Sequence, residues 1–140
     1  MKFVFKVTEV NREILAKYPY AALDGDLTIL IKDAVFLDDG VALLEFALCI
    51  NSWLINVKTG TLPDFDYSSD EYTENPVLHL SKVDARHYQI HSAWALTSSE
   101  KILGLGEITH CFESFLQELD RHTQQAYGIS LTEMRFFENR

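Results

Sequence analysis

The amino-acid sequence predicts an α+β fold in which an antiparallel sheet of about four to six strands carries two long helices on one face. Short segments that alternate between apolar and polar residues occur in two groups, and a long segment with helical periodicity follows each group. Each long segment has a single apolar stripe, which is what a helix packed on a sheet requires. The 140 residues suit one domain with an adequate core.

The longest apolar segment, residues 39–60, predicts the first helix. Its apolar residues recur at helical spacing and form one broad stripe, which consists of Leu43, Phe46, Ala47, Ile50, Trp53, Leu54 and Val57. Residues 42–50 also alternate, so a strand is the alternative, but a strand of about 17 residues would extend roughly 56 Å, too long for this chain. Asp38 or Asp39 is expected to cap the start of the helix, and Gly60 suits the left-handed residue after its end.

Three strands are expected before this helix. Residues 2–8 alternate and predict a strand with one buried face. Asp24-Gly25-Asp26 predicts a turn, after which residues 27–32 alternate and predict a second strand. A short third strand is expected over residues 34–37. Residues 9–23 show no clear pattern beyond one short helical turn.

Residues 59–76 form the longest segment without a core pattern, and they contain the predicted binding site. Five acidic residues occur in this segment without a basic residue, and three aromatic residues are interleaved with them. Long connections without periodicity are typically functional or disordered, so we expect this segment to contribute few core contacts. The residues predicted to bind a partner are Asp64, Phe65, Asp66, Tyr67, Asp70, Glu71, Tyr72 and Glu74.

The second group of strands leads into the second helix. Residues 77–83 and 86–96 predict a hairpin, and residues 101–105 fit a further short strand. Residues 107–127 have the second helical stripe, and the glycine that follows them is expected to stop the helix. The tail, residues 129–140, is expected to add a short strand or to lie over the core.

The histidines of this hairpin are not expected to form a metal site. With a two-residue loop at Asp84-Ala85, His91 lies across from Leu78, and His79 faces the other side of the sheet. His87 and His91 share a face but stand about 13 Å apart by strand rise, which exceeds the reach of one ion.

Motifs for catalysis are also missing. The GxG pattern before the second helix lacks the third glycine and the lysine of a phosphate-binding loop. Ser92 and His91 are neighbours on a strand and point to opposite faces, so they cannot act as nucleophile and base. Cys49 and Cys111 lie in apolar helical patterns and are expected to be buried free thiols. The sequence therefore predicts no catalytic residue, no cofactor and no metal, although a site assembled from distant residues stays open.

The net charge of −9 is concentrated in one part of the chain. Residues 18–81 contain eleven acidic and two basic residues, whereas the remaining residues contain ten of each. This distribution argues against nucleic acid or an anionic membrane as partner and permits a basic protein partner, with solubility alone as the other explanation. No signal peptide and no apolar run of transmembrane length occur, so a cytoplasmic location is expected.

This layout resembles the small acidic immunity proteins that bacteria keep in the cytosol against toxin domains delivered by neighbouring cells. The resemblance lies in the short chain, the α+β order, the missing catalytic motif and the local acidity, and residues Leu43–Leu54 look like a helix of such domains. It implies a non-catalytic inhibitor whose acidic residues steer a basic toxin domain and whose aromatic residues provide contact area. Two alternatives stay open, namely a structural or adaptor domain and a small-molecule enzyme or binding domain with its site between sheet and helices.

Overall fold

The described strands form two antiparallel sheets, whereas the sequence suggested one, and the α+β class is confirmed. The computed structural model describes residues 1–15, 17–97, 101–132 and 134. In the three-stranded sheet β2 lies between β1 and β3, and in the four-stranded sheet the strands follow chain order. The strands are β1 (Lys2–Val10), β2 (Leu23–Ile31), β3 (Ala34–Ala42), β4 (Phe65–Tyr67), β5 (Leu78–Asp84), β6 (His87–His91) and β7 (Ile102–Gly104).

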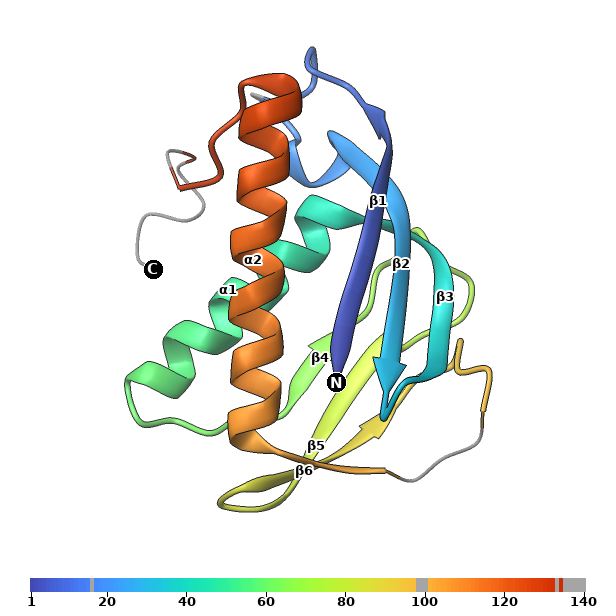
Figure 1. The fold of residues 1–140 in the computed structure, drawn as a ribbon, viewed down its shortest axis with the longest axis vertical. Helices are drawn as coiled ribbons and strands as arrows, with labels where there is room; N and C mark the ends of the chain where they lie inside the picture. Colours follow the sequence, from blue (N-terminus) through green and yellow to red (C-terminus); the bar gives the residue numbers. More distant parts are fainter. Residues whose placement is uncertain (16, 98–100, 133, 135–140) are drawn as a thin grey trace.

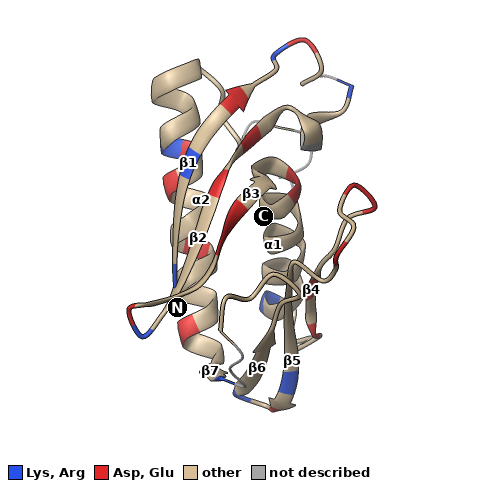
Figure 2. Cartoon of the chain, turned by 90° about the vertical axis from the view of Figure 1, so that its right-hand side faces the viewer, with Lys and Arg blue, Asp and Glu red and all other residues tan. Residues whose placement is uncertain are grey.

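The two helices, α1 (Leu43–Lys58) and α2 (Leu105–Tyr127), cross on one side of the three-stranded sheet (Figures 1 and 2). α1 contacts β2, β3 and β4, and α2 contacts β1 and β7, so each helix packs against both sheets. α1 follows β3 directly and carries the chain away from the first sheet, so β4 starts a second sheet instead of extending the first. None of the helices described is long and apolar enough to cross a membrane.

Aromatic rings from both sheets and both helices meet in one core. The ring of Phe3 on β1 lies 5.4 Å from that of Phe46 on α1 and 5.6 Å from that of Phe115 on α2. Across the core, Phe65 on β4 lies 5.0 Å from Phe112 on α2. The tilted and edge-to-face arrangements of these rings are the favourable ones for aromatic pairs. The predicted helix faces are confirmed, since the buried residues include Phe46, Ile50, Phe112, Phe115 and Leu119.

The strands β2 and β3 are both longer than predicted. β2 begins at Leu23, so the expected turn Asp24-Gly25-Asp26 lies inside a strand. Close packing, and not a turn, explains the glycine at position 25. A Cβ at this position would collide with the carbonyl oxygen of Lys6 and with the side chain of Leu43. β3 extends to Ala42, well beyond the predicted end at residue 37.

The start of α1 differs from the predicted one, whereas its end agrees. Asp38 and Asp39 do not cap the helix, because both belong to β3, where Asp38 accepts a hydrogen bond from the Thr28 hydroxyl at 3.0 Å. The residue before the helix is Ala42, whose methyl side chain cannot accept a capping hydrogen bond. Gly60 follows the helix end with a φ of 91°, the left-handed conformation that glycine adopts without strain.

The register of the second hairpin differs from prediction by one residue. His79 pairs with His91, whereas the predicted partner of His91 was Leu78. The cause is an irregularity between Lys82 and Asp84, which inserts one additional residue next to the turn. The prediction that His79 faces away from the other histidine is therefore wrong, because directly paired residues share a face.

β6 is shorter than predicted and ends at His91 rather than at residue 96. The hydroxyl of Ser92 donates a hydrogen bond to the carbonyl of Val77 at 2.5 Å and accepts one from the amide of Trp94 at 3.0 Å. These bonds turn the chain away from the strand direction. In the tail, Leu131 is buried, and residues 133 and 135–140, which belong to the predicted tail segment, lie outside the described residues.

We expect Phe115→Ala to lower the free energy of unfolding by about 3–5 kcal/mol, because its ring fills the space among three other aromatic rings. Denaturant unfolding measures the change. Gln117→Ala, an exposed position on the same helix, is the control and should change stability by less than about 0.5 kcal/mol. A loss below about 1 kcal/mol for Phe115→Ala contradicts this helix register.

Candidate partner-binding groove

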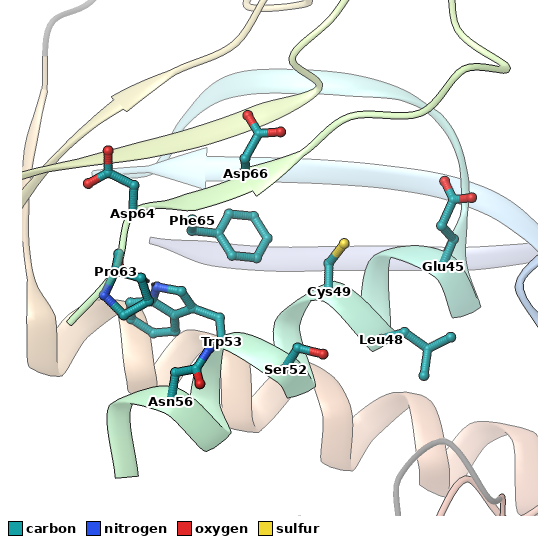
Figure 3. A pocket seen from close by; sticks show the side chains of 10 residues that line it. All are labelled: Glu45, Leu48, Cys49, Ser52, Trp53, Asn56, Pro63, Asp64, Phe65 and Asp66. Atoms are coloured by element: carbon teal, nitrogen blue, oxygen red, sulfur yellow. Dashed lines mark hydrogen bonds between the residues drawn. The ribbon is translucent and has the colours of Figure 1, made fainter. Parts of the chain in front are cut away.

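A groove of about 520 Å³ separates α1 from the edge strand β4 and the residues before it. α1 provides one wall with residues at helical spacing, and the chain around β4 provides the other (Figure 3). The lining residues are Glu45, Leu48, Cys49, Ser52, Trp53, Asn56, Pro63, Asp64, Phe65 and Asp66.

Small side chains on α1 leave this groove open, and aromatic rings form its floor. Cys49 and Ser52 lie opposite β4, and their short side chains do not fill the space between helix and strand. Trp53 and Phe65 are buried below, with ring centroids 6.4 Å apart. The Trp53 indole donates a hydrogen bond to the carbonyl of Pro63 at 2.9 Å, which fixes the chain that enters β4.

Three carboxylates stand at the rim of the groove, and no lysine or arginine among the described residues lines it. The chain holds each carboxylate in place with a hydrogen bond. Asp64 accepts one from the Lys82 amide at 2.7 Å, and Glu45 accepts one from the Tyr67 hydroxyl at 2.8 Å. An oxygen of Asp66 lies 2.9 Å from Nδ1 of the His79 ring. The rim is therefore a preorganised set of negative charges, which lowers the entropy cost of binding a cation.

A second hollow of about 370 Å³ continues the groove toward the turn between β4 and β5. Glu45 lines both hollows, and the others lining the second are Ser68, Ser69, Asp70 and Asn75. The two hollows together form one acidic path along β4 and the turn, which we call the acidic groove.

The turn of residues 68–75 is built into the fold, which corrects the expectation that it contributes few core contacts. The Asn75 side chain accepts a hydrogen bond from the Ser69 amide and donates to the carbonyls of Ser69 and Tyr72. The Trp94 indole donates to the Glu74 carbonyl at 3.0 Å, and its ring lies 4.9 Å from that of Tyr72. These contacts hold the turn in one conformation beside the groove.

Two of the predicted binding residues are core residues instead. Phe65 is 2% exposed and Tyr67 0%, because their side chains point from β4 into the core. A partner cannot reach either ring in the folded chain, so the prediction that they supply contact area is wrong. Burial, together with the hydroxyl of Tyr72 and the carboxylate of Glu45, raises the pKa of Tyr67, so its hydroxyl stays protonated.

The other predicted residues do gather at the groove and its turn. The acidic residues among them are all exposed, namely Asp64, Asp66, Asp70, Glu71 and Glu74. Tyr72 is half-buried, and its hydroxyl accepts a hydrogen bond from the Ala42 amide. The residues of α1 that line the groove were not predicted from the sequence. They could have been recognised as a polar stripe, because Glu45, Cys49, Ser52 and Asn56 recur at helical spacing.

Acidic residues of the three-stranded sheet extend the negative surface beyond the groove. Asp24, Asp26 and Asp38 are exposed on β2 and β3, and Figure 2 shows acidic residues on these strands and on the turn. Partial burial raises the pKa of Asp24, and the nearby charges of Glu9 and Glu71 raise it further. The turn is therefore close enough to the sheet for their charges to repel each other.

The groove contains one thiol, but its environment does not activate it. Burial raises the pKa of Cys49 to about 11, and the carboxylates of Glu45 and Asp66 also raise it. A nucleophilic cysteine needs the opposite, an electropositive site that favours the thiolate. Cys49 is half-buried, whereas Cys111 is buried as predicted, and both are free. Within the described residues, no group of three or more histidine, cysteine or acidic side chains is placed to hold a metal ion.

Comparison with known proteins assigns the chain to a family without giving it an activity. Residues 2–125 match the family model of DUF7878, which is described as a domain of unknown function, and the chain belongs to this family. The matched range includes both sheets and nearly all of α2, so the groove is part of the family domain. No curated protein and no solved structure matches the chain.

We expect Tyr72→Phe to destabilise the fold by about 1–3 kcal/mol, because it removes the hydroxyl that accepts the Ala42 amide at 3.1 Å. Urea unfolding measures the change. Tyr18→Phe, at an exposed position, is the matched control and should leave stability unchanged within error. Equal stability of both variants would mean that the hydrogen bond from Ala42 does not fix the turn to the end of β3.

We expect alkylation of Cys49 in the folded chain to be at least about a hundredfold slower than in the unfolded chain at pH 8. The raised pKa of about 11 depletes the reactive thiolate, and burial restricts access. Iodoacetamide labelling with peptide mass spectrometry measures Cys49 and Cys111 separately. A folded-state rate equal to that in denaturant would show that the thiol is activated, and would reopen a role for it in catalysis.

Proposed function

We propose that this chain is a non-catalytic inhibitor of the immunity-protein class, which binds a basic toxin domain through the acidic groove and acts in the cytoplasm. The observation that carries the proposal is the preformed groove, whose rim has three anchored carboxylates and, among the described residues, no lysine or arginine. Such a surface is complementary to lysine and arginine side chains on a partner.

The charge distribution supports a partner that is attracted over a long range. The net charge is −9, and the exposed acidic residues of the turn and of β2 add to the field of the groove. A clustered field of one sign raises the association rate of an oppositely charged protein by about 10–1000-fold at low salt. Many toxins of neighbouring bacteria are basic nucleases, and an acidic surface can occupy the site where their substrate binds.

The groove fits a macromolecular partner better than the alternatives. A small-molecule enzyme or binding domain needs an enclosed pocket with convergent polar groups, whereas this groove is open along the length of β4 and its thiol is protonated. A purely structural domain does not require three oriented carboxylates around a groove that no lysine or arginine of the described residues lines. The hydrogen bonds that orient them support a surface built for a cationic partner.

We expect the triple substitution Asp66→Asn, Asp70→Asn and Glu71→Gln to slow association with the toxin by about tenfold at low salt and to flatten its salt dependence. The partner in this test is the product of the adjoining gene, and the measurement is binding kinetics at two salt concentrations. Dissociation should change less, because exposed charges act mainly on the encounter.

The matched control is the triple substitution Glu13→Gln, Glu113→Gln and Glu118→Gln, which removes the same charge from positions that do not line the groove. Its effect on association should be clearly smaller. Equal effects of the two sets would mean that net charge alone attracts the partner. No binding by the wild-type chain, and no protection of cells that express the neighbouring gene, would contradict the proposal itself.

A further inference from the structure

The free edge of β4 suggests how a partner would enter the acidic groove. We infer that the occupant is an extended segment of the partner, which adds to the four-stranded sheet as an antiparallel strand beside β4 and alternates basic with small apolar residues. This inference rests on the proposed function, and it specifies the binding mode and the chemistry of the segment that binds.

The backbone of Asp66 points away from the sheet, toward the open side of β4. The Lys82 amide on β5 is directed to the β4 side, where it donates to the Asp64 carboxylate. Residues two apart in a strand direct their amides to the same side, so Leu80 and Leu78 bond to their partners Phe65 and Tyr67. Asp66 lies between these bonded pairs, and its N–H and C=O are therefore directed away from β5.

The space beside this edge is the acidic groove. β4 is the terminal strand of its sheet, so no strand within the described residues covers its outer side. The first hollow is lined by Asp64 and Asp66, and the second by Ser68, so the two hollows follow β4 along its length. Opposite the edge stand Cys49 and Ser52, whose short side chains leave room for another chain. Strand addition to an exposed edge is a common mode of peptide recognition.

The two sides of the groove determine which side chains such a strand needs. A residue paired with Asp66 projects its side chain to the same face as the Asp66 carboxylate, and opposite charges stabilise a cross-strand pair. The neighbouring residues project toward α1, where the half-buried Leu48 and Cys49 offer an apolar surface. Lysine or arginine at every second position, with small apolar residues between, satisfies both faces.

A second copy of this chain is a poor occupant of the same edge. Pairing β4 with another β4 would place the carboxylates of Asp64 and Asp66 next to their counterparts, and like charges across strands are destabilising. The same charges also protect the edge against aggregation, which is the competing explanation of their position. The test below separates a protected edge from a binding edge.

The probe is the heptapeptide Lys-Val-Lys-Val-Lys-Val-Lys, titrated at low salt into the full chain labelled with 15N. We expect chemical-shift changes to centre on the amides of Asp66 and Ser68. Methylating the backbone amides of the inner lysines should weaken binding by about tenfold, because these amides face β4, whereas methylating those of the valines should have little effect. A peptide of equal composition with the lysines grouped should bind more weakly than the alternating one.

Equal binding of the alternating, grouped and methylated peptides would overturn the strand mode and leave only charge attraction at an acidic surface. Loss on valine methylation instead would overturn the antiparallel register. Failure of the alternating peptide to shift the Asp66 amide at millimolar concentration would show that the edge is only protected. None of these results changes whether the chain inhibits its toxin, so the proposed function is judged separately by the protection and kinetic experiments.

Variants of the chain give an independent test with the same peptide. Asp66→Pro removes an N–H that does not bond to β5, so the melting temperature should stay near that of Asp66→Asn, whereas peptide binding should fall well below that of Asp66→Asn. Equal peptide affinity of the two folded variants would contradict the bond from the Asp66 amide. If Asp66→Pro does not fold, the methylated peptides still decide the question with the wild-type chain.

Discussion

The aromatic contacts of Phe46 connect every layer of this fold. Its ring lies 5.4 Å from Phe3 of the first sheet, 5.1 Å from Tyr67 of the second sheet and 5.4 Å from Phe115 of α2. One helical residue therefore holds two sheets and the other helix at fixed positions. The groove depends on this arrangement, because the depth at which α1 packs determines how far its polar face stands from β4.

The face of α1 that is turned to the core and the face that lines the groove belong to one helix. The stability of the fold and the proposed binding are therefore linked through it. Glu45 lies one residue before Phe46. Its carboxylate accepts a hydrogen bond from the hydroxyl of Tyr67, whose ring packs on Phe46. The Tyr72 hydroxyl approaches that of Tyr67 to 3.2 Å and accepts the Ala42 amide. The negative charge at the rim is thereby fixed to the start of the helix, and the proposed partner would meet it in a defined position.

Periodicity in the sequence was sufficient for the long elements and insufficient for the short ones. The stripes containing Phe46 and Phe115 repeat over several turns, so both helices and most of their buried positions were predicted correctly. His122 and Ala126, at the end of the second stripe, are exposed instead. β4 has only three residues, too few for a period of two to be visible, so Phe65 and Tyr67 were assigned to a loop. The face on which His79 lies depends on an irregularity beside the hairpin turn, and the need for glycine at position 25 depends on a contact with Leu43. Neither feature can be recognised from the neighbouring residues in the sequence. Charge, by contrast, did indicate the acidic turn.

The turn between β4 and β5 separates the residues that keep its shape from those that display its charge. Asn75, Tyr72 and Trp94 make the side-chain contacts that hold it, whereas no side-chain hydrogen bond of Asp70, Glu71 or Glu74 occurs among the described residues. Related chains can therefore exchange these three positions during evolution at little risk to folding. A lineage under pressure from a changing adversary would gain from such freedom, since its recognition surface can diverge while its scaffold is inherited intact.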